Sequence, residues 1–261
     1  MSGATRITAA IAAANKQGRP ALIPFITAGH PDMNGFAEHV AILAEAGDVV
    51  EIGVPFTDPL ADGVTIQRSS ERALKAGVSL SWILDTLEQS AAQRTAPVLL
   101  MSYLNPLLTM GYETLAGRCV DAGVAGFIVP DLPFEESAPL RAAIEPRGLA
   151  LVQLVSPVTS GERMKKLCEA SAGFVYAVTV TGVTGGGGKA DQAAILAYLD
   201  RVREVSPLPV CAGFGIREAA QVNAIGTHAD GVIVGSALVE VLEQDGDARA
   251  FLQSLGGKLH E

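Results

Sequence analysis

The sequence has few cysteines, no concentrated positive charge and no long apolar run. The three cysteines lie among apolar neighbours and lack metal-ligand spacing, so we expect buried, reduced thiols (Cys119, Cys168, Cys211). Lys and Arg number 19 against 28 Asp and Glu, a net charge of -9, and no basic cluster could neutralise nucleic-acid phosphates. No apolar stretch reaches the length of a membrane span, and residues 1–18 lack a secretory signal. We therefore expect a cytoplasmic protein that binds neither nucleic acid nor membrane.

Histidine is also scarce, with four residues that show no metal spacing (His30, His39, His228, His260). No metal site is expected from them. His30 lies in a loop between predicted elements, but its position alone assigns it no role.

Short apolar runs alternate with amphipathic segments along the 261 residues. The predicted strands are Ala21–Thr27, Val49–Gly53, Pro97–Met101, Gly126–Val129, Ala150–Val155, Phe174–Val178, Pro209–Ala212 and Gly231–Val234. The predicted helices include Met33–Ala46, Leu80–Gln93, Tyr112–Ala122, Glu135–Arg147, Glu162–Ala170, Gln192–Val205, Glu218–Ile225 and a last one from Ala237. Such apolar strands between helices are typical of a parallel sheet that is buried on both faces.

Eight strand–helix units in this length predict an α/β protein with a (β/α)₈ TIM barrel, as one domain over residues 1–261. A helix over Arg6–Gln17 would cover the bottom of the barrel. A doubly wound open sheet is the alternative, but the chain has no early Gly-x-Gly-x-x-Gly motif.

The run from Glu51 to Gly63 is the most informative segment for chemistry. Glu51 interrupts a buried strand, where a carboxylate is costly unless it is paired or used. The Pro/Asp-rich loop that follows brings Asp58 and Asp62 over the same end of the barrel. Acid–base chemistry is the leading interpretation. Alternatively, a neighbouring hydroxyl satisfies Glu51, Asp62 caps the helix that starts near Thr65, and Asp58 shapes a turn.

Glycine-rich loops follow the last three predicted strands. Gly213-Phe214-Gly215 and Gly235-Ser236 stand after strands seven and eight, where barrels commonly hold a phosphate group on backbone N–H groups. Tight turns before helices are the simpler interpretation of these glycines. The run Gly185–Gly188 after strand six is interpreted as the hinge of a lid, with a surface loop as the alternative.

Several of these motifs together resemble the tryptophan synthase α subunit family, over about residues 6–255. They are the run Ala21–Gly29, the segment from Glu51 to Gly63, Pro130–Pro133, Tyr176 with Thr181–Gly185, and Gly213–Ile216. The resemblance implies a (β/α)₈ barrel that cleaves indole-3-glycerol phosphate to indole and glyceraldehyde 3-phosphate in tryptophan biosynthesis. It also implies an allosteric α2β2 complex, in which the indole passes to a β subunit that carries pyridoxal phosphate, and no cofactor in this chain.

The resemblance further implies the roles of individual residues. Glu51 corresponds to the general acid/base, and Asp62 to the carboxylate that accepts the indole N–H. The remaining substrate contacts are the pocket walls Phe25, Tyr103 and Tyr176, the lid residue Thr184, and the phosphate ligands Gly185, Phe214, Gly215, Gly235 and Ser236. From its depth in the barrel, we expect Glu51 to have a higher pKa than Asp62.

Two departures from the family pattern bear on activity. Val64 stands where family members often carry proline, and three glycines follow Gly185 in the lid. Looser loops cost more entropy to close, so we expect low activity of the isolated chain and strong activation by a partner. The alternatives are a standalone indole-3-glycerol phosphate lyase and a non-catalytic barrel that binds a phosphorylated ligand.

Overall fold

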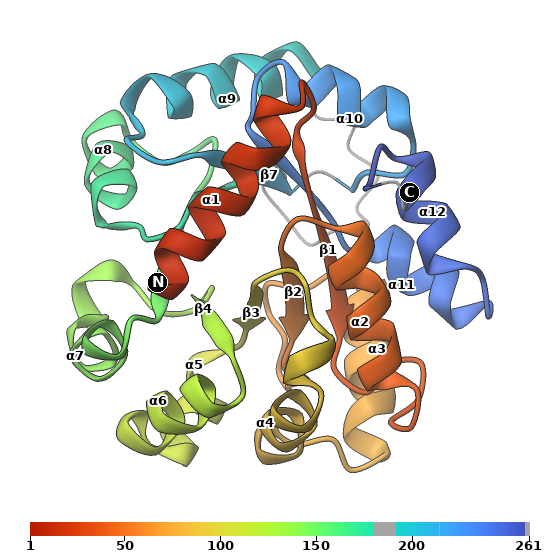
Figure 1. Ribbon diagram of the computed structural model, residues 1–261. Coiled ribbons are helices and arrows are strands. Elements are labelled where there is room, and N and C mark those ends of the chain that lie inside the picture. The colour runs from red at the N-terminus through yellow and green to blue at the C-terminus, as the bar shows by residue number, and fades with distance from the viewer. Residues whose placement is uncertain (180–191, 214, 259–261) are drawn as a thin grey trace.

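The computed structural model describes residues 1–179, 192–213 and 215–258, which form a closed barrel of parallel strands ringed by helices (Figure 1). The strands are β1 (Ala21–Thr27), β2 (Val50–Gly53), β3 (Val98–Met101), β4 (Val124–Ile128), β5 (Ala150–Val155), β6 (Val175–Val178), β7 (Val210–Gly213) and β8 (Gly231–Val234). Each strand pairs with the next in chain order, and β1 closes the ring against β8. The predicted (β/α)₈ TIM barrel is confirmed, and every strand begins and ends within two residues of its predicted bounds.

Helices surround this ring of strands and cover one end of it. They are α1 (Gly3–Lys16), α2 (Phe36–Ala46), α3 (Val64–Lys75), α4 (Leu80–Gln89), α5 (Leu104–Met110), α6 (Tyr112–Asp121), α7 (Ala138–Ile144), α8 (Gly161–Ala170), α9 (Gln192–Val205), α10 (Ala219–Gly226), α11 (Ser236–Glu243) and α12 (Ala248–Ser254). Within the described part of the chain, no helix is both long and apolar enough to cross a membrane.

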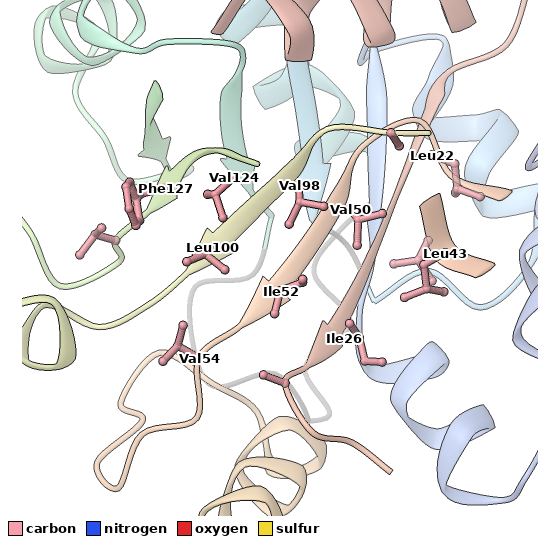
Figure 2. Packing of buried hydrophobic residues seen from close by; sticks show 14 of the residues in the cluster. Leu22, Ile26, Leu43, Val50, Ile52, Val54, Val98, Leu100, Val124 and Phe127 are labelled. Carbon is pink, nitrogen blue, oxygen red and sulfur yellow. The ribbon is translucent and has the colours of Figure 1, made fainter. Parts of the chain in front are cut away.

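The core has two layers because successive residues of a strand point to opposite faces. Even-numbered residues of the first strands, such as Leu22, Val50 and Ile52, pack outward against the helices (Figure 2). Odd-numbered residues such as Ile23 and Leu99 fill the barrel interior. Glu51 has this same inward parity, since it is in register with Leu99 of β3.

Helix α1 covers the bottom of the barrel, as the sequence predicts. Its residues Ile7 and Ile11 are fully buried and belong to the interior cluster. Ser2 caps the helix by accepting a hydrogen bond from the Thr5 N–H. Gly3 lies so close to Ala125 that a Cβ atom would be 1.8 Å from its carbonyl oxygen. The helix therefore seals one end, and the opposite end of the barrel is left for the active site.

Helix α5 is not among the helices that the sequence predicts. Its first N–H, that of Leu104, donates to the Asp131 carboxylate at 2.9 Å, across 27 residues of sequence. The Pro106 ring is compatible with the first turn of a helix. The stabilising contact is distant in sequence, so local pattern could not reveal it.

Candidate active site

A cavity of about 430 Å³ opens at the C-terminal ends of the strands. It is lined by both predicted carboxylates, Glu51 and Asp62, and by Gly215, Gly235 and Ser236 from the predicted phosphate loops. The strand order of the barrel thus brings together the acid loop after β2 and the glycine loops after β7 and β8.

Glu51 lines this cavity from β2, between Phe25 of β1 and Leu99 of β3 in the sheet register. Its side chain is fully buried, and within the described residues neither carboxylate oxygen has a hydrogen-bond partner. The alternative that a hydroxyl group satisfies Glu51 is therefore wrong for these residues. Burial, and secondarily the charge of Asp62, raise the pKa of Glu51 to about 8. Glu51 is consequently a carboxylic acid at neutral pH, with a proton available to a ligand.

Asp62 lies in the loop between β2 and α3 and is partly exposed to the cavity. Helix α3 has Gly63 as its N-cap and no side-chain capping bond, so Asp62 does not cap it. Burial raises the pKa of Asp62 to about 6, while a hydrogen bond with Tyr103 acts in the opposite direction. Asp62 is therefore largely ionised at neutral pH, and the two carboxyl pKa values stand in the order that the sequence predicts.

Tyr103 lies behind Asp62 and is buried. Its hydroxyl accepts a hydrogen bond from the Ala61 N–H at 2.8 Å. The same hydroxyl interacts with the Asp62 carboxylate, and its ring stacks on Phe56 at a centroid distance of 5.1 Å. Tyr103 thus holds the acid loop in place rather than facing the main cavity.

Two aromatic walls of the cavity each lie over a glycine of the next strand. A Cβ atom on Gly53 would come within 2.5 Å of the Phe25 ring, and one on Gly213 within 2.7 Å of the Tyr176 hydroxyl. Desolvation and the charges of Glu51 and Asp62 raise the pKa of Tyr176 well above its ordinary value, so its phenol stays protonated. An aromatic residue in one strand and a glycine at the end of the next strand form a pattern in the sequence from which these two walls can be predicted.

The glycine loops form the side of the cavity where α11 begins. Gly235 is the N-cap of α11, and Ser236 is its first residue. The first N–H groups of a helix have no partner within the helix, and its dipole favours an anion there. Gly215 has a φ of 59°, in the left-handed region that favours glycine. This side of the cavity is therefore suited to a phosphate group.

Three predicted contact residues, Thr184, Gly185 and Phe214, lie outside the described residues, as does the predicted lid hinge Gly185–Gly188. The structure does bring in apolar residues that the sequence argument did not name. They include Ile66, Met101, Leu154, Val178 and Ile233. Strand parity places most of them inward, and it could have identified them in advance.

The remaining polar candidates lie elsewhere. His30 is buried, and its Nε2 lies 3.2 Å from the Val239 carbonyl oxygen, outside the cavity lining. Among the described residues, no group of three His, Cys, Asp or Glu side chains could hold a metal ion. Cys119, Cys168 and Cys211 are free and buried, as predicted.

Known proteins are similar to this chain in both sequence and fold. The sequence model of the family "Tryptophan synthase alpha chain" matches residues 11–255. The chain belongs to the tryptophan synthase alpha chain family. The alpha chain of Desulfovibrio desulfuricans is 48% identical over 246 residues, covering 93% of this chain and 96% of that one. The alpha chain of Nitratidesulfovibrio vulgaris (strain DP4) is 44% identical, covering 96% and 98%.

Solved structures agree. A chain of Mycobacterium tuberculosis tryptophan synthase superimposes with a TM-score of 0.88 at 37% identity, covering 98% of this chain and 99% of that one. Tryptophan synthase subunit alpha from Legionella pneumophila gives a TM-score of 0.86 at 34% identity, covering 98% and 97%. As a tryptophan synthase alpha chain, the protein is an indole-3-glycerol-phosphate lyase of tryptophan biosynthesis. The family carries no cofactor of its own, and pyridoxal phosphate is bound by the beta subunit.

Proposed function

We propose that Glu51 and Asp62 share the retro-aldol cleavage of indole-3-glycerol phosphate, with the substrate phosphate bound at Gly215, Gly235 and Ser236. One observation carries the assignment. Two carboxyl groups with raised but different pKa values, about 8 and about 6, line the same cavity as the first residue of α11. Between these pH values one group is an acid and the other a carboxylate, as the cleavage requires.

The reaction needs a proton on indole C3 and the loss of one from the glycerol hydroxyl. Glu51 enters protonated and donates its proton to C3, and positive charge develops on the ring towards the indole nitrogen. The Asp62 carboxylate accepts a hydrogen bond from the indole N–H and stabilises the positive charge as it forms. The Glu51 carboxylate then removes the hydroxyl proton as the carbon–carbon bond breaks to give the aldehyde. Glu51 is thereby reprotonated, and one carboxyl group serves both proton transfers.

Of the described residues, those that line the phosphate end of the cavity (Gly215, Gly235 and Ser236) carry no charged side chain. Arg217 lies two residues beyond Gly215, but its guanidinium group binds Glu240 at 2.7 Å and 3.0 Å. Backbone N–H groups, the Ser236 hydroxyl and the dipole of α11 would therefore hold the phosphate. Thr184, Gly185 and Phe214 are retained in this proposal from the family resemblance, with Thr184 orienting Asp62.

A tryptophan synthase beta subunit is the proposed partner, in an α2β2 complex, since the homologues are alpha chains of tryptophan synthase. Apolar residues are exposed around the mouth of the barrel: Leu60 is 87% exposed, Val64 66% and Leu108 50%. The first two lie in or beside the acid loop, whose residues Asp58 and Pro59 are proposed to meet the partner. A beta subunit that covers them would order the loop that carries Asp62.

Indole release from indole-3-glycerol phosphate tests this function, measured with and without a purified tryptophan synthase beta subunit. We expect slow release by the chain alone and an increase of at least about tenfold at saturating partner, because ordering the loops removes part of the entropy cost of closure. Equal rates in both conditions would identify a standalone lyase. Absence of indole in both would leave only a phosphate-binding barrel.

Leu108 offers a test of the interface itself. In Leu108→Asp we expect the Kd for the beta subunit to rise about tenfold or more, because a charge replaces apolar contact area. Val120→Asp is the matched control, since Val120 is 47% exposed but lies near the end of α6, before β4. Calorimetric titration measures both, and equal losses in the two variants would refute this placement of the interface.

A further inference from the structure

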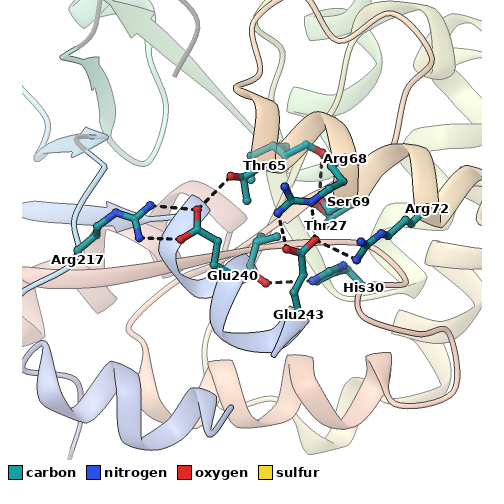
Figure 3. Close-up of polar contacts among 11 residues, drawn as sticks. Thr27, His30, Thr65, Arg68, Ser69, Arg72, Arg217, Glu240 and Glu243 are labelled. Carbon is teal, nitrogen blue, oxygen red and sulfur yellow. Dashed lines mark hydrogen bonds and ion pairs between the residues drawn. The ribbon is translucent and has the colours of Figure 1, made fainter. Parts of the chain in front are cut away.

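Helix α11, which begins at the proposed phosphate site, carries two glutamates that face α3. Glu243 accepts hydrogen bonds from Arg68 at 3.0 Å and 2.5 Å, and from Arg72 at 3.2 Å. Glu240 accepts one from the Thr65 hydroxyl at 3.1 Å. Residues 65, 68 and 72 recur at three- and four-residue spacing, so they share one face of α3. Figure 3 shows the two helices joined along this face.

Glu240 has a second set of contacts that Glu243 lacks. Arg217, from the segment after β7, donates to both of its carboxylate oxygens, at 2.7 Å and 3.0 Å (Figure 3). The Arg217 N–H donates to the Gln221 side chain at 2.7 Å, and Gln221 also forms the capping box of α10 with Glu218. Arg217 is therefore fixed at its main chain and at its guanidinium group. The Arg217 hydrogen bonds also lower the pKa of Glu240, which keeps it ionised at neutral pH.

The positions of these groups in the chain relate them to the cavity. Thr65 is three residues beyond Asp62, Arg217 two beyond Gly215, and Glu240 four beyond Ser236. One carboxylate thus joins the helix after the acid loop, the loop after β7 and the helix after β8. Glu240 lines no part of the cavity itself.

We propose that Glu240 is a positioning residue that couples the phosphate-binding loops to the acid loop, so that an anion at Gly215 and Ser236 favours the Asp62 position that receives indole. The inference rests on the function proposed above and extends it. An anion that orders the start of α11 and the loop after β7 fixes the position of Glu240 on its own helix and that of its partner Arg217. The hydrogen bond from the Thr65 hydroxyl to Glu240 then restrains the start of α3, which follows the acid loop. A shift of about 1 Å in a group such as Asp62 can cost about a hundredfold in rate, so a modest contact acts strongly here.

Calorimetric titration of indole, with and without saturating inorganic phosphate, tests the coupling. In the unaltered chain we expect phosphate to raise indole affinity about fivefold or more. In Glu240→Gln, the ratio of the indole affinity with phosphate to that without phosphate should fall to near one. The kcat/KM for the full substrate should fall about tenfold. Thr65→Val should have the same effect on this affinity ratio while leaving the ion pairs of Glu240 and Glu243 in place. The double variant should lose nothing further, because both changes break one link.

Asp85→Asn is the control, since it removes an exposed ion pair with Arg118 away from the cavity. It should keep the phosphate effect. A Glu240→Gln protein that also keeps the phosphate effect on indole affinity would overturn the inference. An unaltered chain whose indole affinity does not change with phosphate would overturn it too. Either result leaves the proposed function intact if the chain still releases indole with its partner. Failure of that release contradicts the function separately.

Discussion

Substitution of Glu51 by glutamine is expected to lower kcat for indole release by about 10²- to 10⁴-fold, the usual contribution of a general acid/base. Glutamine has nearly the same shape, so the cavity and the Asp62 loop should be retained. It cannot supply a proton to C3 or remove one from the hydroxyl. A single-turnover assay with saturating beta subunit isolates the chemical step. A kcat within about threefold of the unaltered chain would contradict the role of Glu51.

The same substitution should stabilise the fold at alkaline pH. Because the pKa of Glu51 is raised to about 8, the folded chain holds this proton more tightly than the unfolded chain. Stability contributed by the protonated group is present below the unfolded pKa of about 4.5, and it is lost as pH rises through about 8. That loss has a slope approaching about 1.4 kcal/mol per pH unit.

Urea unfolding at pH 5 and pH 8.5 measures this difference. Glu51→Gln should be close to the unaltered chain at pH 5 and clearly more stable at pH 8.5. Glu88→Gln, at an exposed position on α4, should follow the unaltered chain at both values. Parallel stability curves for all three proteins would show that Glu51 titrates normally. The activity and stability results together separate loss of a proton donor from damage to the fold.

The barrel and its two main carboxyl groups could be predicted because they depend on short sequence patterns, namely the spacing of apolar strands and the residues at strand ends. Apolar strands at regular intervals specify the ring, and a parallel barrel presents every strand's C-terminal end at one face. Glu51 at a strand end and Gly235-Ser236 before a helix therefore had to lie near the same opening. The inward direction of Glu51 follows from strand parity, which continues the pattern of Ile23 and Leu99.

Contacts between distant segments could not be predicted in this way. The resemblance implies that Tyr103 is a wall of the pocket, whereas in the structure its hydroxyl accepts a hydrogen bond from the Ala61 N–H and interacts with Asp62 behind the main cavity. The hydrogen bond from the Leu104 N–H to Asp131, and those of Glu240 with Thr65 and Arg217, likewise join segments that follow different strands. Each depends on side-chain length and direction across the barrel, which local periodicity does not encode.

Substitution of Asp62 by asparagine is expected to lower kcat about 10²- to 10³-fold, as loss of one electrostatic stabiliser of a transition state does. Asparagine keeps an oxygen that can accept the indole N–H, but it lacks the negative charge that opposes the positive ring. KM should change little, since the charge is needed chiefly in the transition state. Asp121→Asn, at the exposed end of α6, is the control and should retain full activity.

The pH profile of Asp62→Asn tests the pairing of the two acids. In the unaltered chain, kcat/KM should rise through about pH 6 as Asp62 ionises, and it should fall through about pH 8 as Glu51 loses its proton. In Asp62→Asn the acid limb should disappear. The alkaline limb should move to lower pH, because the Asp62 charge contributes to the raised pKa of Glu51. A profile flat from pH 5 to 9 in the unaltered chain, with chemistry rate-limiting, would refute the assignment. An alkaline limb that does not move in the variant would mean that burial alone raises the pKa of Glu51, and that the two carboxyl groups act independently.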